Sequence, residues 1–178
     1  MRAIGRGSIS SILKITVDVA WVIACALLGF IWIIAILSLI AMLRGQGMIP
    51  GFEIEISRPN EVIVWTLNGT VLAVSAMIVC SYLRGIFETL VAGDPFVPDN
   101  ARRLRSIALV VAVMEIARLT IAIVVQVALN ALGVTPDDGT QHFITPNLSV
   151  WFSVLTLFVL AQVFREGAAM REEQKMTI

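Results

Sequence analysis

The sequence has 178 residues, of which 58% are hydrophobic and only 15% charged, with a mean hydropathy of +0.89. Soluble domains are usually about 45–50% apolar, so this composition excludes a soluble globular protein and predicts one that lies in a bilayer. The 13 basic residues balance the 13 acidic ones. We therefore expect no direct binding of nucleic acid or another polyanion.

Four apolar runs, taken in chain order, predict four transmembrane helices. We place the spans at about residues 15–43, 62–83, 106–132 and 147–166, joined by loops at 44–61, 84–105 and 133–146. Each run is long enough for a helix that rises about 1.5 Å per residue to cross a hydrocarbon core of about 30 Å. Residues 167–178 are expected to form a helical cytoplasmic tail. The predicted fold class is an all-α membrane protein with four transmembrane helices in a bundle.

The distribution of basic residues predicts the topology. If the N-terminus is cytoplasmic, ten of the basic residues lie on the inner side and two on the outer side. The inner ones are Arg2, Arg6, Lys14, Arg84, Arg102, Arg103, Arg105, Arg165, Arg171 and Lys175, and the outer ones are Arg44 and Arg58. Because cytoplasmic loops carry an excess of Lys and Arg, we expect both termini in the cytoplasm.

The two outer loops predict a small β cap and no metal site. Residues 52–56 alternate apolar and acidic side chains, and residues 141–145 are also rich in strand formers, so we expect the two to pair. His142 and the acidic residues of these loops (Glu53, Glu55, Asp137 and Asp138) lack the spacing of metal ligands. We expect no metal and no cofactor.

The third span contains the charged residues Glu115 and Arg118, which lie three apart and so share one helical face. A lone charge at this depth costs at least about 2.5–3.5 kcal/mol, so we expect the two to neutralise each other inside the bundle. The alternative is a small transporter, coupled to protons or cations, with Glu115 as the titrating group. All 6 prolines lie outside the four spans, so the broken helices of many transporters are not predicted.

Enzyme activity is not expected, because no motif with catalytic spacing occurs. The sequence has no HExxH, GxSxG or P-loop pattern. Cys25 and Cys80 are not spaced as CxxC, which disfavours a thiol oxidoreductase.

The inner loop contains a compact polar signature. Gly93 is expected to end the second helix, Asp94-Pro95 to open a turn, and Pro98 to occupy the first position of a helix that continues into the third span. Three arginines, Arg102, Arg103 and Arg105, then fall at the level of the lipid headgroups.

This signature resembles a known family. Residues 93–96, followed by Asn100 and residues 103–105, together with the endings 160–167 and 171–174, are similar to bacterial membrane proteins catalogued as domain of unknown function 2975. The resemblance implies four-helix proteins of the bacterial cytoplasmic (inner) membrane. Their genes often lie beside that of a small Cro/C1-type helix-turn-helix regulator, which implies a membrane partner that binds or sequesters the regulator.

We therefore predict a membrane-tethered regulatory partner of a cytoplasmic transcription factor. The partner surface would combine the inner loop with the C-terminal helix, with Phe96 as an apolar anchor and arginines facing the acidic residues of the tail. Its residues would be Asp94, Pro95, Phe96, Asn100, Arg102, Arg103, Arg165, Glu166, Glu172, Glu173 and Gln174. A further alternative is an accessory subunit of a membrane complex, and the sequence is compatible with an oligomer.

Overall fold

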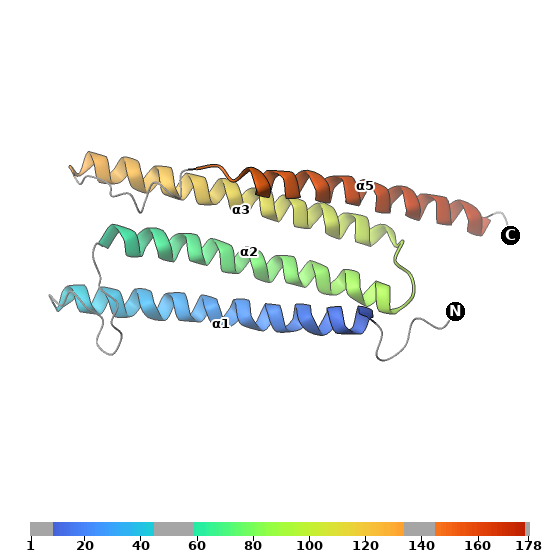
Figure 1. The fold of residues 1–178 in the computed structure, drawn as a ribbon, viewed down its shortest axis with the longest axis horizontal. Coiled ribbons are helices and arrows are strands. Elements are labelled where there is room, and N and C mark those ends of the chain that lie inside the picture. The colour runs from blue at the N-terminus through green and yellow to red at the C-terminus, as the bar shows by residue number, and fades with distance from the viewer. Residues whose placement is uncertain (1–8, 45–58, 134–144, 177–178) are drawn as a thin grey trace. The chain divides into compact units, whose positions relative to one another are not determined.

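The described part of the computed structural model, residues 9–44, 59–133 and 145–176, consists of long helices (Figure 1). They are α1 (Ile9–Leu43), α2 (Pro59–Val91), α3 (Pro98–Ala131) and α5 (Leu148–Met176). Each contains a segment long and apolar enough to cross a membrane. The chain therefore has four candidate spans in the order that the apolar runs predict.

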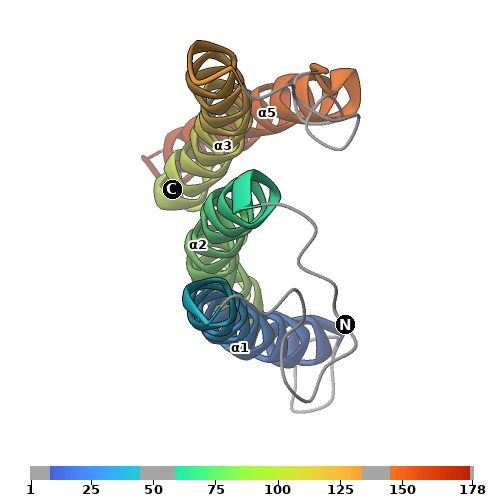
Figure 2. The ribbon, with the colours of Figure 1, turned by 90° about the vertical axis from the view of Figure 1, so that its left-hand side faces the viewer.

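The all-α prediction is confirmed for the described residues. Every element there is a helix and no strand occurs among them (Figures 1 and 2). Residues 52–56 and 141–144, which carry nearly all of the predicted β cap, lie outside the described residues. The cap stays a prediction.

The helices continue beyond the apolar runs on the side of the inner loop. Helix α2 extends to Val91 and α3 starts at Pro98, so only residues 92–97, which we call the link, separate them. Hydropathy shows where a helix leaves the hydrocarbon core of the membrane. The helix itself continues until capping residues end it. Polar residues such as Arg84 and Glu88 are good helix formers and continue the same helix.

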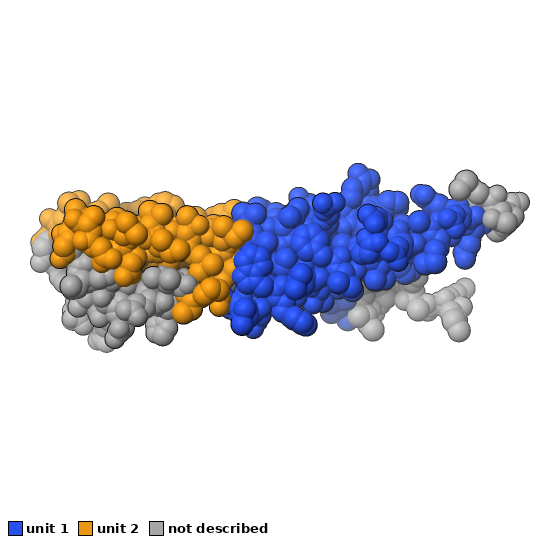
Figure 3. Space-filling view, turned by 90° about the horizontal axis from the view of Figure 1, so that it is seen from above, with its two compact units in different colours: residues 1–23, 75–113, 147–178 blue, residues 24–74, 114–146 orange. Residues whose placement is uncertain are grey.

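The chain divides into two compact units, which are coloured separately in Figure 3. Unit 1 comprises residues 1–23, 75–113 and 147–178, and it contains the link. Its core consists of Ile86, Leu104, Ile107 and Ala161, contributed by α2, α3 and α5. Two ion pairs join α1 to α2 in this unit: Lys14 Nζ lies 3.2 Å from Glu88 Oε1, and Arg84 Nε lies 3.4 Å from Asp18 Oδ1.

Unit 2 comprises residues 24–74 and 114–146, and most of its buried side chains are small. Ala41, Ala73 and Ala122 are buried, while Trp65 and Val124 are more than half exposed. This arrangement is the reverse of that in a soluble protein, where large apolar side chains are mostly buried. It is expected where lipid surrounds the helices, because small residues allow close helix packing and large apolar ones can face the acyl chains.

Candidate functional site

The link begins with a fixed turn at the end of α2. Gly93 has a φ of 83°, and its N–H donates to the carbonyl of Leu90 at 3.1 Å. The N–H of Asp94 donates to the carbonyl of Thr89 at 3.0 Å. These two bonds form a Schellman motif, which needs a left-handed residue and therefore favours glycine. The helix end predicted at Gly93 is confirmed.

Asn100 joins the link to both neighbouring helices. It is 0% exposed, and its Nδ2 donates to Thr89 Oγ1 at 2.6 Å and to the carbonyl of Pro95 at 2.9 Å. Its Oδ1 accepts from Arg103 Nη1 at 3.1 Å. Arg103 Nη1 also donates to the carbonyl of Gly85, at 2.7 Å. Every polar group of the Asn100 amide is thereby engaged, as a buried amide requires.

Two further residues of the link contact α5, and we call this set of contacts the clasp. The ring centroids of Phe96 and Phe164 are 5.6 Å apart, within the range of favourable aromatic pairs. Phe96 also packs against Gly167, where an added Cβ would lie 2.7 Å from Phe96 Cδ1. Asp94 forms an ion pair with Arg171, one turn farther along α5. The inner-loop signature is therefore in contact with the C-terminal segments, residues 160–167 and 171–174, that share in the family resemblance.

The other arginines and the acidic residues of α5 that were predicted for the partner surface do not belong to the clasp. Arg102 donates to Asp99 at 2.6 Å, and Arg103 turns towards Gly85 instead of towards the acidic residues of α5. Glu166 accepts from Gln162 at 2.5 Å. The predicted partner residues on α5 are all exposed: Arg165, Glu166, Glu172, Glu173 and Gln174.

Several residues of this region were not among the predicted ones. Gly85 and Gly167 accommodate the side chains of Arg103 and Phe96, and Arg171 is the partner of Asp94. A glycine inside a helix costs about 1 kcal/mol relative to alanine, so it often marks a place where another group approaches closely. Both glycines lie inside helices, so the sequence contained a signal for these two close contacts.

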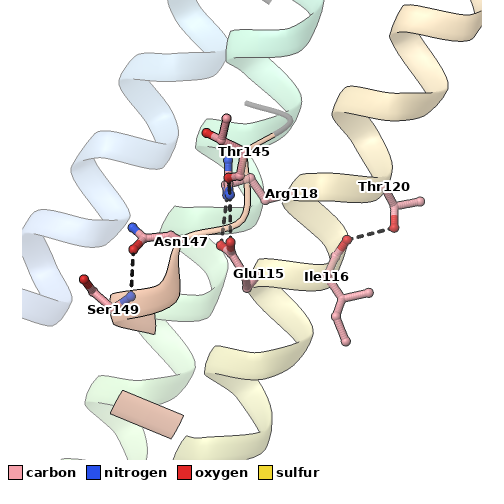
Figure 4. A network of polar contacts seen from close by, with 7 residues as sticks. All are labelled: Glu115, Ile116, Arg118, Thr120, Thr145, Asn147 and Ser149. Atoms are coloured by element: carbon pink, nitrogen blue, oxygen red, sulfur yellow. Dashed lines mark hydrogen bonds and ion pairs between the residues drawn. The ribbon is translucent and has the colours of Figure 1, made fainter. Parts of the chain in front are cut away.

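The predicted intramembrane residues form a bidentate ion pair (Figure 4). Arg118 Nε donates to Glu115 Oε2 at 2.9 Å, and Arg118 Nη2 donates to Glu115 Oε1 at 2.7 Å. The Glu115 side chain is 1% exposed and that of Arg118 is 22% exposed. Two parallel charge-assisted bonds fix both the charge balance and the geometry of the pair.

Arg118 also holds a backbone group outside the helices. Its Nη2 donates to the carbonyl of Thr145 at 2.8 Å. From Arg118 to Ala131, α3 continues for about 20 Å at 1.5 Å per residue, so Thr145 lies far back along this helix. A carbonyl outside a helix is tolerated at membrane depth only where protein or water satisfies it. Arg118 provides that bond just before α5 starts.

Helix α5 begins with a side-chain cap. Asn147 Oδ1 accepts from the N–H of Ser149 at 3.1 Å, as in an N-cap (Figure 4). The chain is thus anchored through Thr145 immediately before this capped helix start.

No group of three or more potential metal ligands occurs within residues 9–44, 59–133 and 145–176. His142 and the acidic residues of the two outer loops lie outside these ranges. Cys25 and Cys80 are both unpaired thiols.

Four long apolar helices and a buried ion pair within one of them define a multi-pass membrane protein. The family model for the "Protein of unknown function (DUF2975)" family matches residues 55–178, and the chain belongs to this family. The match covers α2, α3 and α5 and begins after α1. No curated protein and no solved structure matches the sequence.

Proposed function

We propose that this protein is a membrane-tethered regulatory partner that binds a cytoplasmic helix-turn-helix transcription factor and keeps it from DNA. The observation that carries the proposal is the clasp, because it joins the inner-loop signature to the C-terminal part of α5 in one structured surface, next to the beginning of α3. The resemblance to proteins encoded beside such regulators supports the kind of partner. The ten-to-two distribution of basic residues supports placing this surface and both termini in the cytoplasm of a bacterium.

The charge of α5 supports the mode of binding. Glu166, Glu172 and Glu173 are exposed on this helix beyond the apolar run. DNA-binding faces are basic because they contact phosphates, so exposed carboxylates on a helix can pair with such a face and exclude DNA from it. In this proposal Asp94, Phe96 and Arg171 position α5, while the acidic residues near its end contact the regulator.

The test is the affinity of the purified full chain for a small helix-turn-helix regulator of the kind often encoded beside genes of this family. We expect Glu172→Gln with Glu173→Gln to weaken binding about tenfold, since a loss of about 1.4 kcal/mol corresponds to that factor. The matched control is Asp18→Asn with Asp99→Asn, which also removes two carboxylates but leaves α5 unchanged. Equal affinities of the two double variants would contradict the acidic surface. Recovery of membrane proteins in place of the regulator would favour an accessory subunit.

The Glu115–Arg118 pair supports a second candidate function, a small proton- or cation-coupled transporter. Ionisable residues inside membranes often serve in proton relays, and Glu115 is almost fully buried. In proteoliposomes, Glu115→Gln should then abolish a proton-linked flux while regulator binding stays unchanged. Loss of regulator binding by Phe96→Ala, with no flux in the unaltered protein, would decide for the regulatory function.

A further inference from the structure

A groove in unit 1 lies between the beginning of α3 and the middle of α5. Its volume is about 420 Å³, within the range of about 300–1,000 Å³ that is typical of small-molecule sites. The apolar part of its lining includes Ala101, Phe158 and Ala161, and three guanidinium groups belong to Arg102, Arg105 and Arg165. The groove therefore combines an apolar surface with a cluster of positive charge.

Two of the three arginines are available for a ligand. Arg102 is paired with Asp99, whereas Arg105 and Arg165 have no hydrogen-bond or ion-pair partner among the described residues. Glu166, the carboxylate of α5 adjacent to Arg165 in sequence, is not among the lining residues of the groove, and it accepts a hydrogen bond from Gln162. The groove thus keeps an uncompensated positive charge, and a phosphate group would match two guanidinium groups well.

The position of the arginines relates the groove to the membrane surface. Arg105 immediately precedes the apolar run of α3, and Arg165 immediately follows that of α5. Both side chains therefore stand at the boundary between apolar and polar phases, where lipid headgroups lie. Basic pockets between transmembrane helices at this level are sites for anionic lipid headgroups.

Apolar surface continues from the groove into the membrane. Leu109 follows Arg105 by one helical turn on α3, and Leu155 precedes Phe158 by one turn on α5, so each shares the face of the groove residue next to it. Leu109 is 49% exposed and Leu155 is 64% exposed. An acyl chain would cover these side chains, which a free phosphate ion would leave uncovered.

From these observations we infer that the α3–α5 groove binds an anionic glycerophospholipid of the phosphatidylglycerol class. Arg105 and Arg165 hold its phosphate, Ala101 and Phe158 contact the glycerol region, and the acyl chains extend over Leu109 and Leu155. The inference requires only that the helices span a membrane, so it stands or fails separately from the proposed regulator.

The experiment measures the thermal stability of the full chain in neutral micelles during titration with lipid. We expect dioleoylphosphatidylglycerol to raise the Tm in a saturable way, because a ligand that binds only the folded state stabilises it. Dioleoylphosphatidylcholine and inorganic phosphate should leave the Tm unchanged at the same concentrations. An equal response to phosphatidylcholine would show unspecific solvation, and an equal response to inorganic phosphate would show a simple anion site; either result would overturn the proposal.

Variants locate the site. Arg105→Gln with Arg165→Gln should weaken the apparent affinity for phosphatidylglycerol at least tenfold, whereas Arg105→Lys with Arg165→Lys should retain more of it. The matched control is Lys14→Gln with Arg84→Gln, which removes two cations outside the groove and should retain the unaltered affinity. Since all these variants are read against their own Tm without lipid, a general loss of stability is recognised directly. Unaltered affinity of the Gln double variant would refute the site.

Discussion

Replacing Arg118 by leucine should lower the free energy of unfolding by about 3–5 kcal/mol, because it leaves a buried carboxylate without its partner. Both oxygens of Glu115 accept from Arg118, and the Glu115 side chain is only 1% exposed. Without the guanidinium, Glu115 must remain charged in an apolar surrounding or take up a proton. The carbonyl of Thr145 also loses its donor. Reversible unfolding in mixed micelles measures the change.

The matched control for this prediction removes both charges. Glu115→Leu with Arg118→Leu leaves no isolated charge, and replacing a whole buried ion pair by apolar residues is often neutral or stabilising. We therefore expect the double variant to be more stable than Arg118→Leu, although it retains the loss at Thr145. If the single variant is as stable as the double variant, Arg118 does not compensate a buried charge on Glu115.

Gly167→Ala should destabilise the protein by about 1–3 kcal/mol, although alanine is the better helix former. The added Cβ would lie 2.7 Å from Cδ1 and 2.9 Å from Cε1 of Phe96, so the ring must leave its place against α5. Displacement of the ring would also weaken the neighbouring pair of Asp94 and Arg171. The same unfolding measurement tests this prediction.

Two controls separate the clasp from the general effect of replacing a helical glycine. Gly29 lies inside α1, and an added Cβ there would meet nothing within 4 Å, so Gly29→Ala should be neutral or slightly stabilising. In a Phe96→Ala background the obstacle is gone, so Gly167→Ala should change sign and stabilise the protein. Persistent destabilisation in that background would show that Phe96 is not the cause.

The helical fold and the intramembrane pair could be predicted because their signals are local. The apolar runs are long enough to identify helices individually, and Gly93 and Pro98 mark helix ends by backbone chemistry alone. Glu115 and Arg118 lie on the same helical face, so their contact follows from the spacing.

The clasp could be predicted only in part, because it depends on pairing between distant segments. The sequence placed Phe96 and the C-terminal helix at the same end, but it predicted that Arg103 would face the acidic residues of that helix and did not indicate that Arg171 would pair with Asp94. The sequence also did not indicate that Arg118 donates a hydrogen bond to the carbonyl of Thr145. Which polar side chain meets which depends on the rotation of each helix about its axis, and long apolar helices in lipid encode that rotation weakly.

The sequence separation within these contacts has a consequence for biosynthesis. The bond from Asn100 to Thr89 spans 11 positions, whereas the contact between Asp94 and Arg171 spans 77. The turn between α2 and α3 can consequently be complete while the ribosome is still translating the fourth helix. The contact of Asp94 waits until Arg171 has been synthesised. Closure of the clasp therefore requires α5, and a nascent chain that stops before this helix would have an unpaired Asp94 and a Phe96 without its contacts to Phe164 and Gly167.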